Sequence, residues 1–323
     1  MKLRILLTGK NGQLGWELQR HLPWLGDVIA LDHNQLDLAD PGAIRRTLQE
    51  LRPHLIVNAA AYTDVNKAET DYVAAQAANG DALAVMAEEA KRISAALVHY
   101  STDYVFDGTK SSPYEEADEP NPINAYGKTK LAGERAIHSA GVPHLILRTS
   151  WVYATRRKNF LLTFLRLASQ KEELPVVEDQ IGSPTWSRMV GVGTRRILAA
   201  IHSQEFGFSR LHEFSGIYHL TAAGETSWCD FARAILEECS DSSQLGPWFL
   251  AVTGGQPLPR RSIVPVSSSN YPTPARRPAY SVLSNNKLRQ VFGMELPHWR
   301  SQLRSALREA ETNDVQRISI TRS

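Results

Sequence analysis

Two residues at helical spacing, Tyr126 and Lys130, form the pair with the clearest chemical potential in this sequence. Residues at positions i and i+4 of a helix lie on one face, so a phenol and an ammonium at this spacing can meet. A cation beside a phenol lowers the pKa of the phenol, which makes a proton donor that works near neutral pH. Ordinary amphipathic helices also contain such pairs, so the spacing alone leaves both interpretations open.

A glycine-rich turn near the N-terminus adds a second chemical element. The apolar run 3–7 predicts a buried strand, and the spacing G-x-x-G-x-x-G follows it before a helical pattern that ends near Leu22. Glycines in such a strand–turn–helix unit let the backbone approach a pyrophosphate, which then lies at the positive end of the helix. The alternative is a glycine turn that binds nothing. From this turn we predict dinucleotide contacts by Gly9, Asn11, Gly12, Gln13 and Leu14.

Acidic and small residues after the next two predicted strands extend this site. Asp32 follows the apolar run 28–31, where a carboxylate can accept hydrogen bonds from the adenosine ribose and favours NAD. Lys10 and His33 can offset the charge of a 2′-phosphate, so NADPH and NADH both stay open. After the third predicted strand, small residues either admit a flat ligand or simply pack. The remaining predicted cofactor contacts are Asp37, Leu38, Ala59, Ala60, Ala61, Tyr126 and Lys130.

Hydroxyl side chains follow the predicted buried strand 96–100. Ser101 and Thr102 stand at its carboxyl end, where parallel sheets bind ligands, although such a pair often only ends a strand or caps a helix. A loop rich in proline and acidic residues then leads to the helix of Tyr126, which Asn121 or Asn124 can start. One long helix, over about residues 72–92, is predicted before this strand and carries Asn79.

The alternation of strands and helices predicts an α/β fold, with a Rossmann-type doubly wound parallel sheet and a smaller C-terminal substrate-binding lobe. Residues 1–150 are the expected NAD(P)-binding domain, and residues 151–311 form mainly the lobe, interleaved with the first part. Residues 312–323 are polar and aperiodic and are predicted to be a disordered tail. Further helical patterns lie near 158–171, 186–203, 226–239 and 297–311, and short strands near 174–177 and 217–220.

The composition excludes several classes of function. With 36 basic and 34 acidic residues, the net charge of +2 argues against nucleic acid or membranes as partners. Cys229 and Cys239 form neither a disulfide framework nor a metal-binding spacing, and they suit a reducing cytosol, which predicts a cytoplasmic location. The apolar run at the N-terminus is too short for a signal peptide, and no run reaches the ~18 residues of a membrane span.

Seven sequence blocks, taken in order, resemble one enzyme family over nearly the whole chain. They are 9–18, 57–63, 101–106, 126–134, 148–153, 179–185 and 271–278. Together they are similar to dTDP-4-dehydrorhamnose reductases, within the extended short-chain dehydrogenase/reductase family. The resemblance implies reduction of the 4-keto group of dTDP-4-dehydro-β-L-rhamnose by NADPH or NADH to give dTDP-L-rhamnose, the last step of dTDP-rhamnose biosynthesis.

The resemblance also implies roles for individual residues. A reduced nicotinamide delivers hydride to the sugar C4, and Tyr126 donates a proton to the oxygen. Lys130 lowers the pKa of that tyrosine and bonds the nicotinamide ribose, while Thr102 donates a hydrogen bond to the carbonyl. Asn79 matches a helix asparagine that supports a proton-relay water. The implied substrate contacts are Thr102, Tyr104, Tyr126, Trp151, Gln180, Arg276 and Arg277.

Two of these substrate contacts have plain alternatives. An arginine can pair bidentately with the dTDP pyrophosphate, but Arg276 and Arg277 can also belong to a solvated basic turn. Trp151 either stacks on the sugar or fills the core. Tyr104 is expected to line the site because a phenol has a polar tip.

One position departs from the pattern of the family. Some relatives bind Mg²⁺ through glutamates near a dimer interface, and Glu17 is retained here, but Arg188 stands where a further carboxylate is expected. A cation disfavours a metal at that place, so we predict no metal site and no Mg²⁺-bridged dimer. A homodimer, and a Mg²⁺ requirement in assays, stay open.

Two other functions fit the same motifs. The first is another nucleotide-sugar reductase or epimerase of this fold; an epimerase shows no net oxidation, and the block 272–278 favours the rhamnose reductase. The second is a non-catalytic regulatory subunit that binds a dinucleotide. Such a subunit can lose the Thr–Tyr–Lys set, whereas Thr102, Tyr126 and Lys130 are all present.

Overall fold

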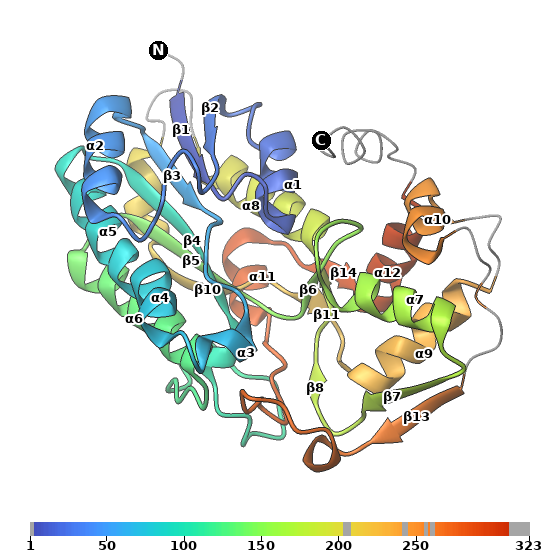
Figure 1. The fold of residues 1–323 in the computed structure, drawn as a ribbon. Coiled ribbons are helices and arrows are strands. Elements are labelled where there is room, and N and C mark those ends of the chain that lie inside the picture. Colours follow the sequence, from blue (N-terminus) through green and yellow to red (C-terminus); the bar gives the residue numbers. More distant parts are fainter. Residues whose placement is uncertain (1–2, 203–207, 241–244, 255–257, 259–261, 310–323) are drawn as a thin grey trace.

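The computed structural model of the protein describes residues 3–309 with gaps at 203–207, 241–244, 255–257 and 259–261, so the predicted tail over 312–323 lies outside the described residues. A parallel sheet with helices on both faces forms one side of the molecule, and a group of shorter elements lies beside it (Figure 1). Within the described ranges, no helix combines the length and the apolar character needed to cross a membrane.

The main sheet has six strands in the order β10-β5-β4-β3-β1-β2, and every pairing is parallel. Its centre is made of strands that are buried at every residue, because helices cover both faces of a parallel sheet. The predicted α/β, doubly wound fold is confirmed. The strands are β1 (Leu3–Thr8), β2 (Gly26–Leu31), β3 (Leu55–Asn58), β4 (Ala96–Thr102), β5 (His144–Thr149) and β10 (Gly216–His219).

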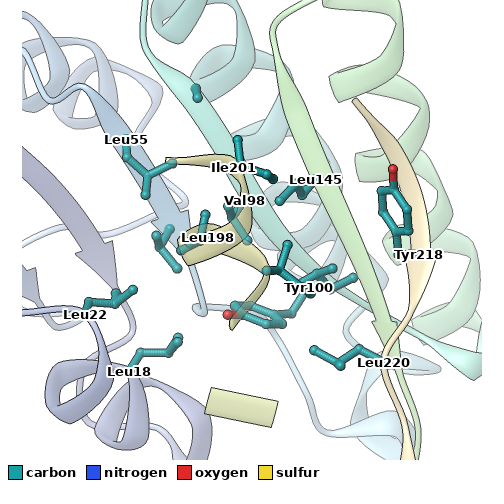
Figure 2. Close-up of a cluster of buried hydrophobic side chains, with 14 of the residues drawn as sticks. Leu18, Leu22, Leu55, Val98, Tyr100, Leu145, Leu198, Ile201, Tyr218 and Leu220 are labelled. Atoms are coloured by element: carbon teal, nitrogen blue, oxygen red, sulfur yellow. The ribbon is translucent and has the colours of Figure 1, made fainter. Parts of the chain in front are cut away.

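Alternate residues of these strands feed two separate cores, as the two-residue period of a strand requires. On one face, α1 (Gln13–His21) and α8 (Ser187–Ile201) pack on the strands; Figure 2 shows Leu18, Leu198 and Val98 meeting there. The opposite face carries α2 (Pro41–Leu51), α5 (Ala82–Arg92) and α6 (Ala125–Ala140).

The single helix predicted over 72–92 is wrong in one respect, because a π-helical turn interrupts it. α4 (Tyr72–Gln76) and α5 are joined by the wider turn Ala77–Asp81, with Asn79 fully buried in it. Such turns often lie at functional sites because they re-aim a side chain. Here the amide of Asn79 bonds both the N–H and the C=O of Tyr62, contacts that tie the turn to the loop after β3.

The second half of the chain forms the shorter elements beside the main sheet and also completes that sheet through β10. The predicted strands near 174–177 and 217–220 occur as β7 and β10, and the four predicted helices occur as α7, α8, α9 and α12. The remaining elements include α3 (Val65–Ala68), β6 (Val152–Tyr153), α7 (Phe160–Gln170), β7 (Glu173–Val177), β8 (Ile181–Gly182), β9 (Thr185–Trp186), β11 (Ala222–Ala223), β12 (Thr226–Ser227), α9 (Trp228–Glu238), α10 (Pro247–Thr253), β13 (Ser262–Val266), α11 (Asn286–Phe292), β14 (Leu296–His298) and α12 (Trp299–Leu307).

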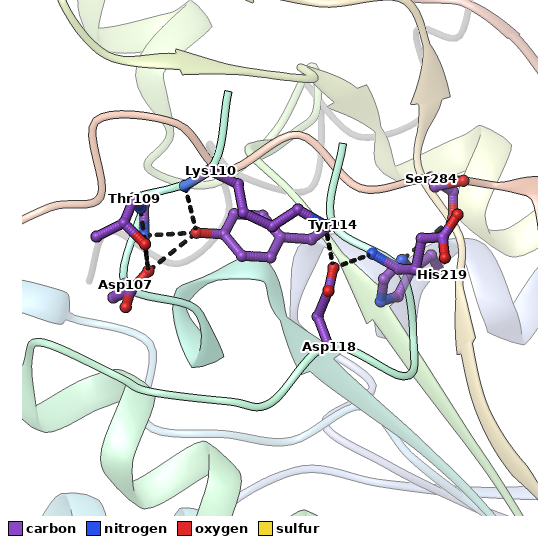
Figure 3. Close-up of polar contacts among 9 residues, drawn as sticks. Asp107, Thr109, Lys110, Tyr114, Asp118, His219 and Ser284 are labelled. Carbon is purple, nitrogen blue, oxygen red and sulfur yellow. Dashed lines mark hydrogen bonds and ion pairs between the residues drawn. The ribbon is translucent and has the colours of Figure 1, made fainter. Parts of the chain in front are cut away.

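Polar contacts hold the loop between β4 and α6, both within the loop and to the C-terminal part of the chain (Figure 3). The Tyr114 hydroxyl donates to Asp107 Oδ1 at 3.0 Å, and Lys110 Nζ pairs with Asp118 Oδ2 at 2.6 Å. The carbonyl of Tyr114 accepts from Ser284 N at 2.8 Å. The segment that leads to Tyr126 is therefore anchored to the C-terminal part of the chain.

Candidate active site

A cavity of about 1010 Å³ lies at the carboxyl ends of the central strands. Every predicted cofactor contact lines it, and so do Thr102, Tyr104 and Trp151 among the predicted substrate contacts. Three further predicted residues, Gln180, Arg276 and Arg277, are described by the structure but lie outside this lining.

The glycine turn leaves room for a ligand at its backbone. Gly9 has a φ of +73°, and a Cβ there would come within 2.7 Å of Ala60 N. A Cβ on Gly15 would lie 2.0 Å from Gly9 O, so the turn can close only without side chains. Gly12 begins α1 without a capping side chain, which leaves the first N–H groups of the helix directed at the cavity for an anion. This cradle fits a pyrophosphate.

Two hydroxyl groups beside the cavity are buried. Ser101 Oγ and Thr149 Oγ1 belong to the lining of the cavity, and neither has a hydrogen-bond partner among the described residues. Buried polar groups are normally satisfied, so these two are exceptions beside the cavity.

Asp32 directly follows β2 and faces the cavity, as predicted. Its carboxylate accepts from Asn11 Nδ2 at 3.1 Å and lies 3.4 Å from Lys10 Nζ. Burial acts to raise the pKa of Asp32, but the charge of Lys10 and the hydrogen bonds from Lys10, Gln35 and Asn11 together outweigh that effect, and the net shift is downward. The cavity is therefore lined by an ionised carboxylate with a cation beside it.

Helix α6 presents Tyr126 from its first turn. Asn124 starts this helix by accepting from Gly127 N at 2.8 Å, so Asn124 rather than Asn121 is the cap. A Cβ on Gly127 would lie 2.1 Å from Tyr104 O, so glycine lets α6 approach the end of β4. The rings of Tyr104 and Tyr126 meet edge to face at 6.1 Å.

The structure corrects the expected effect of Lys130 on Tyr126. Burial, and then the Asp103 carboxylate, raise the pKa of the Tyr126 phenol, and a hydrogen bond with Thr102 offsets this only in part. Burial also lowers the pKa of Lys130 to about 7, against the opposing charge of Glu134. Lys130 is not among the groups that shift the pKa of the phenol in this arrangement. A phenol that stays protonated is nevertheless the state needed to donate a proton to an alkoxide.

Asp103 is a site residue that the sequence reasoning missed. Its buried carboxylate accepts from Thr102 Oγ1 at 3.0 Å and from Ser150 Oγ at 2.9 Å, and burial raises the pKa of Asp103 to about 6. The proton of Thr102, which we expected on the substrate carbonyl, is thus directed at Asp103. Its place at the end of the central strand β4 was the available signal.

Asn79 connects two walls of the site. Besides its two bonds to the backbone of Tyr62, its amide donates to Thr129 Oγ1 of α6 at 3.1 Å. These contacts fix the loop after β3 against the helix of Tyr126. The predicted support of a relay water stays a prediction.

Trp151 lines the cavity and also packs against another aromatic side chain. Its indole stacks on Trp228 with ring centroids 3.5 Å apart and planes 2° apart, and a Cβ on Gly182 would lie 2.4 Å from Trp151 Cε2. Its φ of 45° is unusual for a residue with a side chain. Trp228, at the start of α9, also lines the cavity, and its sequence surroundings contained no motif that predicted this.

The other predicted substrate residues lie outside the lining of the cavity. The Arg277 guanidinium is close enough to Tyr104 to hydrogen-bond its hydroxyl, and it also donates to Asn66 Oδ1 at 3.0 Å. Arg276 is exposed, and its carbonyl accepts from Asn124 Nδ2 at 2.9 Å. Gln180 is half-buried, immediately before β8.

A basic loop at 156–159 reaches the glycine turn and was also missed. Arg157 Nε donates to Asn11 O at 2.8 Å, and Asn159 Nδ2 donates to Gln13 Oε1 at 3.1 Å. Arg157, Lys158 and Asn159 all line the cavity. The run of three basic residues, 156–158, was the signal that could have found this loop.

Arg188 lies between two largely buried carboxylates. Its Nε is 3.3 Å from Glu17 Oε2, its Nη2 pairs with Glu309 Oε1, and Glu309 Oε2 accepts from Thr155 Oγ1 at 3.0 Å. The guanidinium thus supplies positive charge at the place where relatives with a metal were expected to hold one. Across the part of the chain that the structure describes, no group of three His, Cys, Asp or Glu side chains is arranged to hold a metal.

Comparison with known proteins agrees with this geometry. A family model described as "RmlD substrate binding domain" matches residues 2–312. The chain belongs to this family. A dTDP-4-dehydrorhamnose reductase of Burkholderia thailandensis is 50% identical over 299 residues, which cover 92% of this chain and 96% of that protein. One from Escherichia coli (strain K12) is 40% identical over 314 residues, covering 96% and 99%.

A solved structure of the family is also similar. It is a dTDP-4-dehydrorhamnose reductase from Bacillus anthracis str. Ames in complex with NADP, with a TM-score of 0.81 and 33% sequence identity. The similarity covers 95% of this chain and 99% of that one. An NAD(P)-dependent oxidoreductase fold therefore extends over almost the whole described chain.

Proposed function

We propose that this protein reduces the 4-keto group of dTDP-4-dehydro-β-L-rhamnose with NADPH or NADH and so forms dTDP-L-rhamnose. The observation that carries the proposal is that Thr102, Tyr126 and Lys130 line the same cavity as the glycine turn. The names of the curated relatives support the same reaction, since both are dTDP-4-dehydrorhamnose reductases.

The residues of the chain divide the work of this reaction. A reduced nicotinamide supplies the hydride when it is bound. The glycine turn and the first turn of α1 hold the pyrophosphate, and Asp32 accepts from the adenosine ribose. Tyr126, kept as a phenol, donates its proton to the former carbonyl oxygen. Thr102, whose hydroxyl donates to Asp103 in this structure, has to turn that proton toward the oxygen to orient it. Lys130 fixes the nicotinamide ribose.

For the sugar nucleotide we propose a separate set of contacts. Tyr104 and Trp151 bind the sugar from inside the cavity, and Gln180, Arg276 and Arg277 bind from the rim. Arg277 is the strongest of these, because its guanidinium lies beside Tyr104, which lines the cavity, and a guanidinium can pair with a pyrophosphate.

We also propose the organisation and setting of the protein. Residues 1–150 form the dinucleotide-binding part, and residues 151–311 form mainly the substrate lobe. The location is cytoplasmic, since Cys229 and Cys239 are buried and unpaired. A homodimer is proposed to form without a bridging metal, because Arg188 pairs with both Glu17 and Glu309 at that place; sedimentation velocity with and without a chelator tests this.

The decisive experiment follows the absorbance of the reduced nicotinamide with purified protein and dTDP-4-dehydro-β-L-rhamnose. We expect consumption of NADPH or NADH and formation of dTDP-L-rhamnose, with UDP- and GDP-sugars competing poorly. Absence of cofactor consumption would reject the reductase. Conversion of a nucleotide sugar without net consumption would instead identify an epimerase, and dinucleotide binding without any turnover would identify a regulatory subunit.

A further inference from the structure

The loop between β6 and α7 reaches from the second half of the chain to the glycine turn. Arg157 Nε donates to the backbone oxygen of Asn11 at 2.8 Å, and Asn159 Nδ2 donates to Gln13 Oε1 at 3.1 Å. Asn11 lies inside the turn, and Gln13 is the first residue of α1. The loop therefore lies against the N-terminal end of that helix, where the helix has no capping side chain.

Asn159 gives this loop a defined shape. Its Nδ2 lies 2.9 Å from the backbone oxygen of Ala154 and 3.1 Å from that of Arg156. Its Oδ1 accepts from Leu162 N at 3.2 Å, which makes Asn159 the residue that begins α7. One amide thus joins the two ends of the loop, and Arg157 is presented to the cavity from a fixed backbone.

The backbone of Arg157 is in a conformation that residues with a side chain rarely adopt. Its φ is 61°, in the left-handed region, where a residue with a Cβ is strained. Among the described residues, four other than glycine have a positive φ: Arg52, Ser94, Trp151 and Arg157. Trp151 and Arg157 both line the cavity. Strained residues persist where the structure around them enforces the conformation, and they are often found at ligand sites.

The charge of Arg157 is available to a ligand. Across the described residues, three lysine or arginine side chains line the cavity, and they are Lys130, Arg157 and Lys158. Lys130 donates to the backbone oxygen of Tyr100 at 2.7 Å, on β4, two strands away from the β1 that leads into the glycine turn. Within the same described part of the chain, the guanidinium of Arg157 makes one hydrogen bond, from Nε, and no ion pair with an acid. Its two Nη groups therefore remain to donate.

We propose that Arg157 is a binding residue for the pyrophosphate of the dinucleotide. With Nε held by the oxygen of Asn11, the edge formed by Nη1 and Nη2 can pair bidentately with phosphate oxygens, which is the geometry that a guanidinium favours. The backbone N–H groups of the glycine turn bind the same pyrophosphate. Because the loop belongs to the second half of the chain, a dinucleotide bound in this way is contacted by both halves.

The contacts of Asn11 favour the pyrophosphate over a 2′-phosphate as the group that Arg157 binds. The backbone oxygen of Asn11 faces Arg157, whereas its side chain donates to Asp32, the carboxylate proposed for the adenosine ribose. Lys10 supplies the cation beside Asp32, at 3.4 Å. Arg157 and Asp32 thus contact different groups of Asn11. The proposal rests on the proposed dinucleotide site and does not depend on which sugar nucleotide is reduced.

Dinucleotide binding to the full-length protein, measured by calorimetry without any sugar nucleotide, tests the proposal. Arg157→Gly removes the guanidinium, and glycine accepts a φ of 61° without strain, so the backbone of the loop is retained. We expect the Kd of NADPH and the Kd of NADH to rise by the same factor, of about tenfold or more. Arg157→Lys keeps the charge but not the planar fork, so both Kd values should rise by about threefold or more.

Arg52→Gly is the matched control. Arg52 is likewise an exposed arginine with a positive φ, of 42°, but it follows α2 and precedes β3, at the amino end of that strand. The cavity lies at the carboxyl ends of the strands, so this variant removes the same charge and relieves the same kind of backbone strain away from the site. We expect both Kd values to change by less than about twofold.

Three results would overturn the proposal. They are unchanged binding of both cofactors by Arg157→Gly, a loss confined to NADPH, which would assign Arg157 to the 2′-phosphate, and an equal loss in Arg52→Gly. If Arg157→Gly does not fold, as judged by circular dichroism, unchanged binding by Arg157→Lys overturns the proposal. Turnover is not measured, so failure of the proposed reduction does not affect the result. An unmodified protein that binds neither cofactor would reject the dinucleotide site itself, and this proposal with it.

Discussion

The two ends of the cavity are held together in different ways. At the dinucleotide end, the backbone does the shaping: Gly9, Gly12 and the stretch 59–61 come from two short pieces of chain next to two adjacent strands. At the other end, which we propose binds the sugar and call the sugar end, the walls are side chains such as Trp151 and Trp228, which lie far apart in the sequence. A site defined by backbone needs one local stretch to be right, whereas a site defined by side chains needs several distant contacts at once.

The largest expected effect is on the chemical step, with little change in binding at either end of the cavity. Tyr126→Phe removes only the proton donor, so kcat should fall by about a thousandfold or more while the Kd of NADPH changes by less than about threefold. Steady-state absorbance and calorimetry measure the two quantities. Tyr104→Phe, which removes the hydroxyl of the neighbouring ring, should cost far less in kcat. A large loss of NADPH affinity in Tyr126→Phe would show that the two ends are not separable.

Asp103 lies between the two ends and should show itself in the pH dependence of stability. Its folded pKa of about 6 lies above the usual value of 3.8, so the folded state binds the proton more tightly and loses stability as pH rises through that window. Asp103→Asn should therefore match the unmodified protein near pH 4 and exceed it by about 3 kcal/mol above pH 6. Denaturant unfolding at several pH values measures this.

Asp107 provides the comparison of opposite sign. Hydrogen bonds, first from the backbone of Thr109, lower the pKa of Asp107 to about 2 against the effect of burial, so its contribution is present above the usual value and lost as pH falls toward 2. Asp107→Asn should be less stable than the unmodified protein at pH 6, and the difference should shrink in acid. The same pH trend in both variants would contradict the two assignments.

One added methyl group at Gly9 should weaken the binding of the dinucleotide. In Gly9→Ala the new Cβ meets Ala60 N and also forces a side chain into a positive φ, so we expect the Kd of NADPH to rise by about thirtyfold or more. Gly293→Ala is the matched control, since Gly293 has a φ of +61° and no atom within 4 Å of the added Cβ. It tests backbone strain alone. Equal NADPH binding in both variants would remove the glycine turn from the site.

The sugar end should respond to Arg277 and leave the dinucleotide end unchanged. Arg277→Ala removes the guanidinium beside Tyr104, and we expect the KM of the sugar nucleotide to rise by about tenfold at constant Kd for NADPH. Arg276→Ala, at the exposed neighbouring position, should raise KM less. Steady-state kinetics with saturating cofactor measures both. A larger effect in Arg276→Ala would reverse their proposed roles.

The smallest expected effect concerns the choice of cofactor. Asp32→Asn removes a negative charge that repels a 2′-phosphate and weakens the hold on Lys10, so NADPH should gain about threefold over NADH. Competition of the two cofactors in one assay measures the ratio. A shift toward NADH would mean that Asp32 contributes to NADPH binding through Lys10.

The parts of the site that could be predicted from the sequence are those shaped by local backbone, and the parts that could not are those shaped by distant side chains. The glycine turn, Asp32 and the Tyr126 helix could be predicted because strand, turn and helix place them in register. Trp228 could not be predicted, since no nearby sequence motif indicates that the first residue of α9 packs against Trp151. The pKa of Tyr126 was predicted with the wrong sign, because spacing along a helix reveals neighbours but not burial.

The late position of β10 in the sequence affects the folding of the protein during its synthesis. It covers the outer edge of β5 but is encoded about 70 residues later, at 216–219. During synthesis at 5–20 residues per second, the ribosome leaves that edge bare for roughly 3 to 14 seconds. During this interval the N–H and C=O groups of β5 can pair with a strand of another nascent chain. We therefore expect aggregation to be greatest where several ribosomes translate one messenger RNA, and where translation ends before β10 has been made.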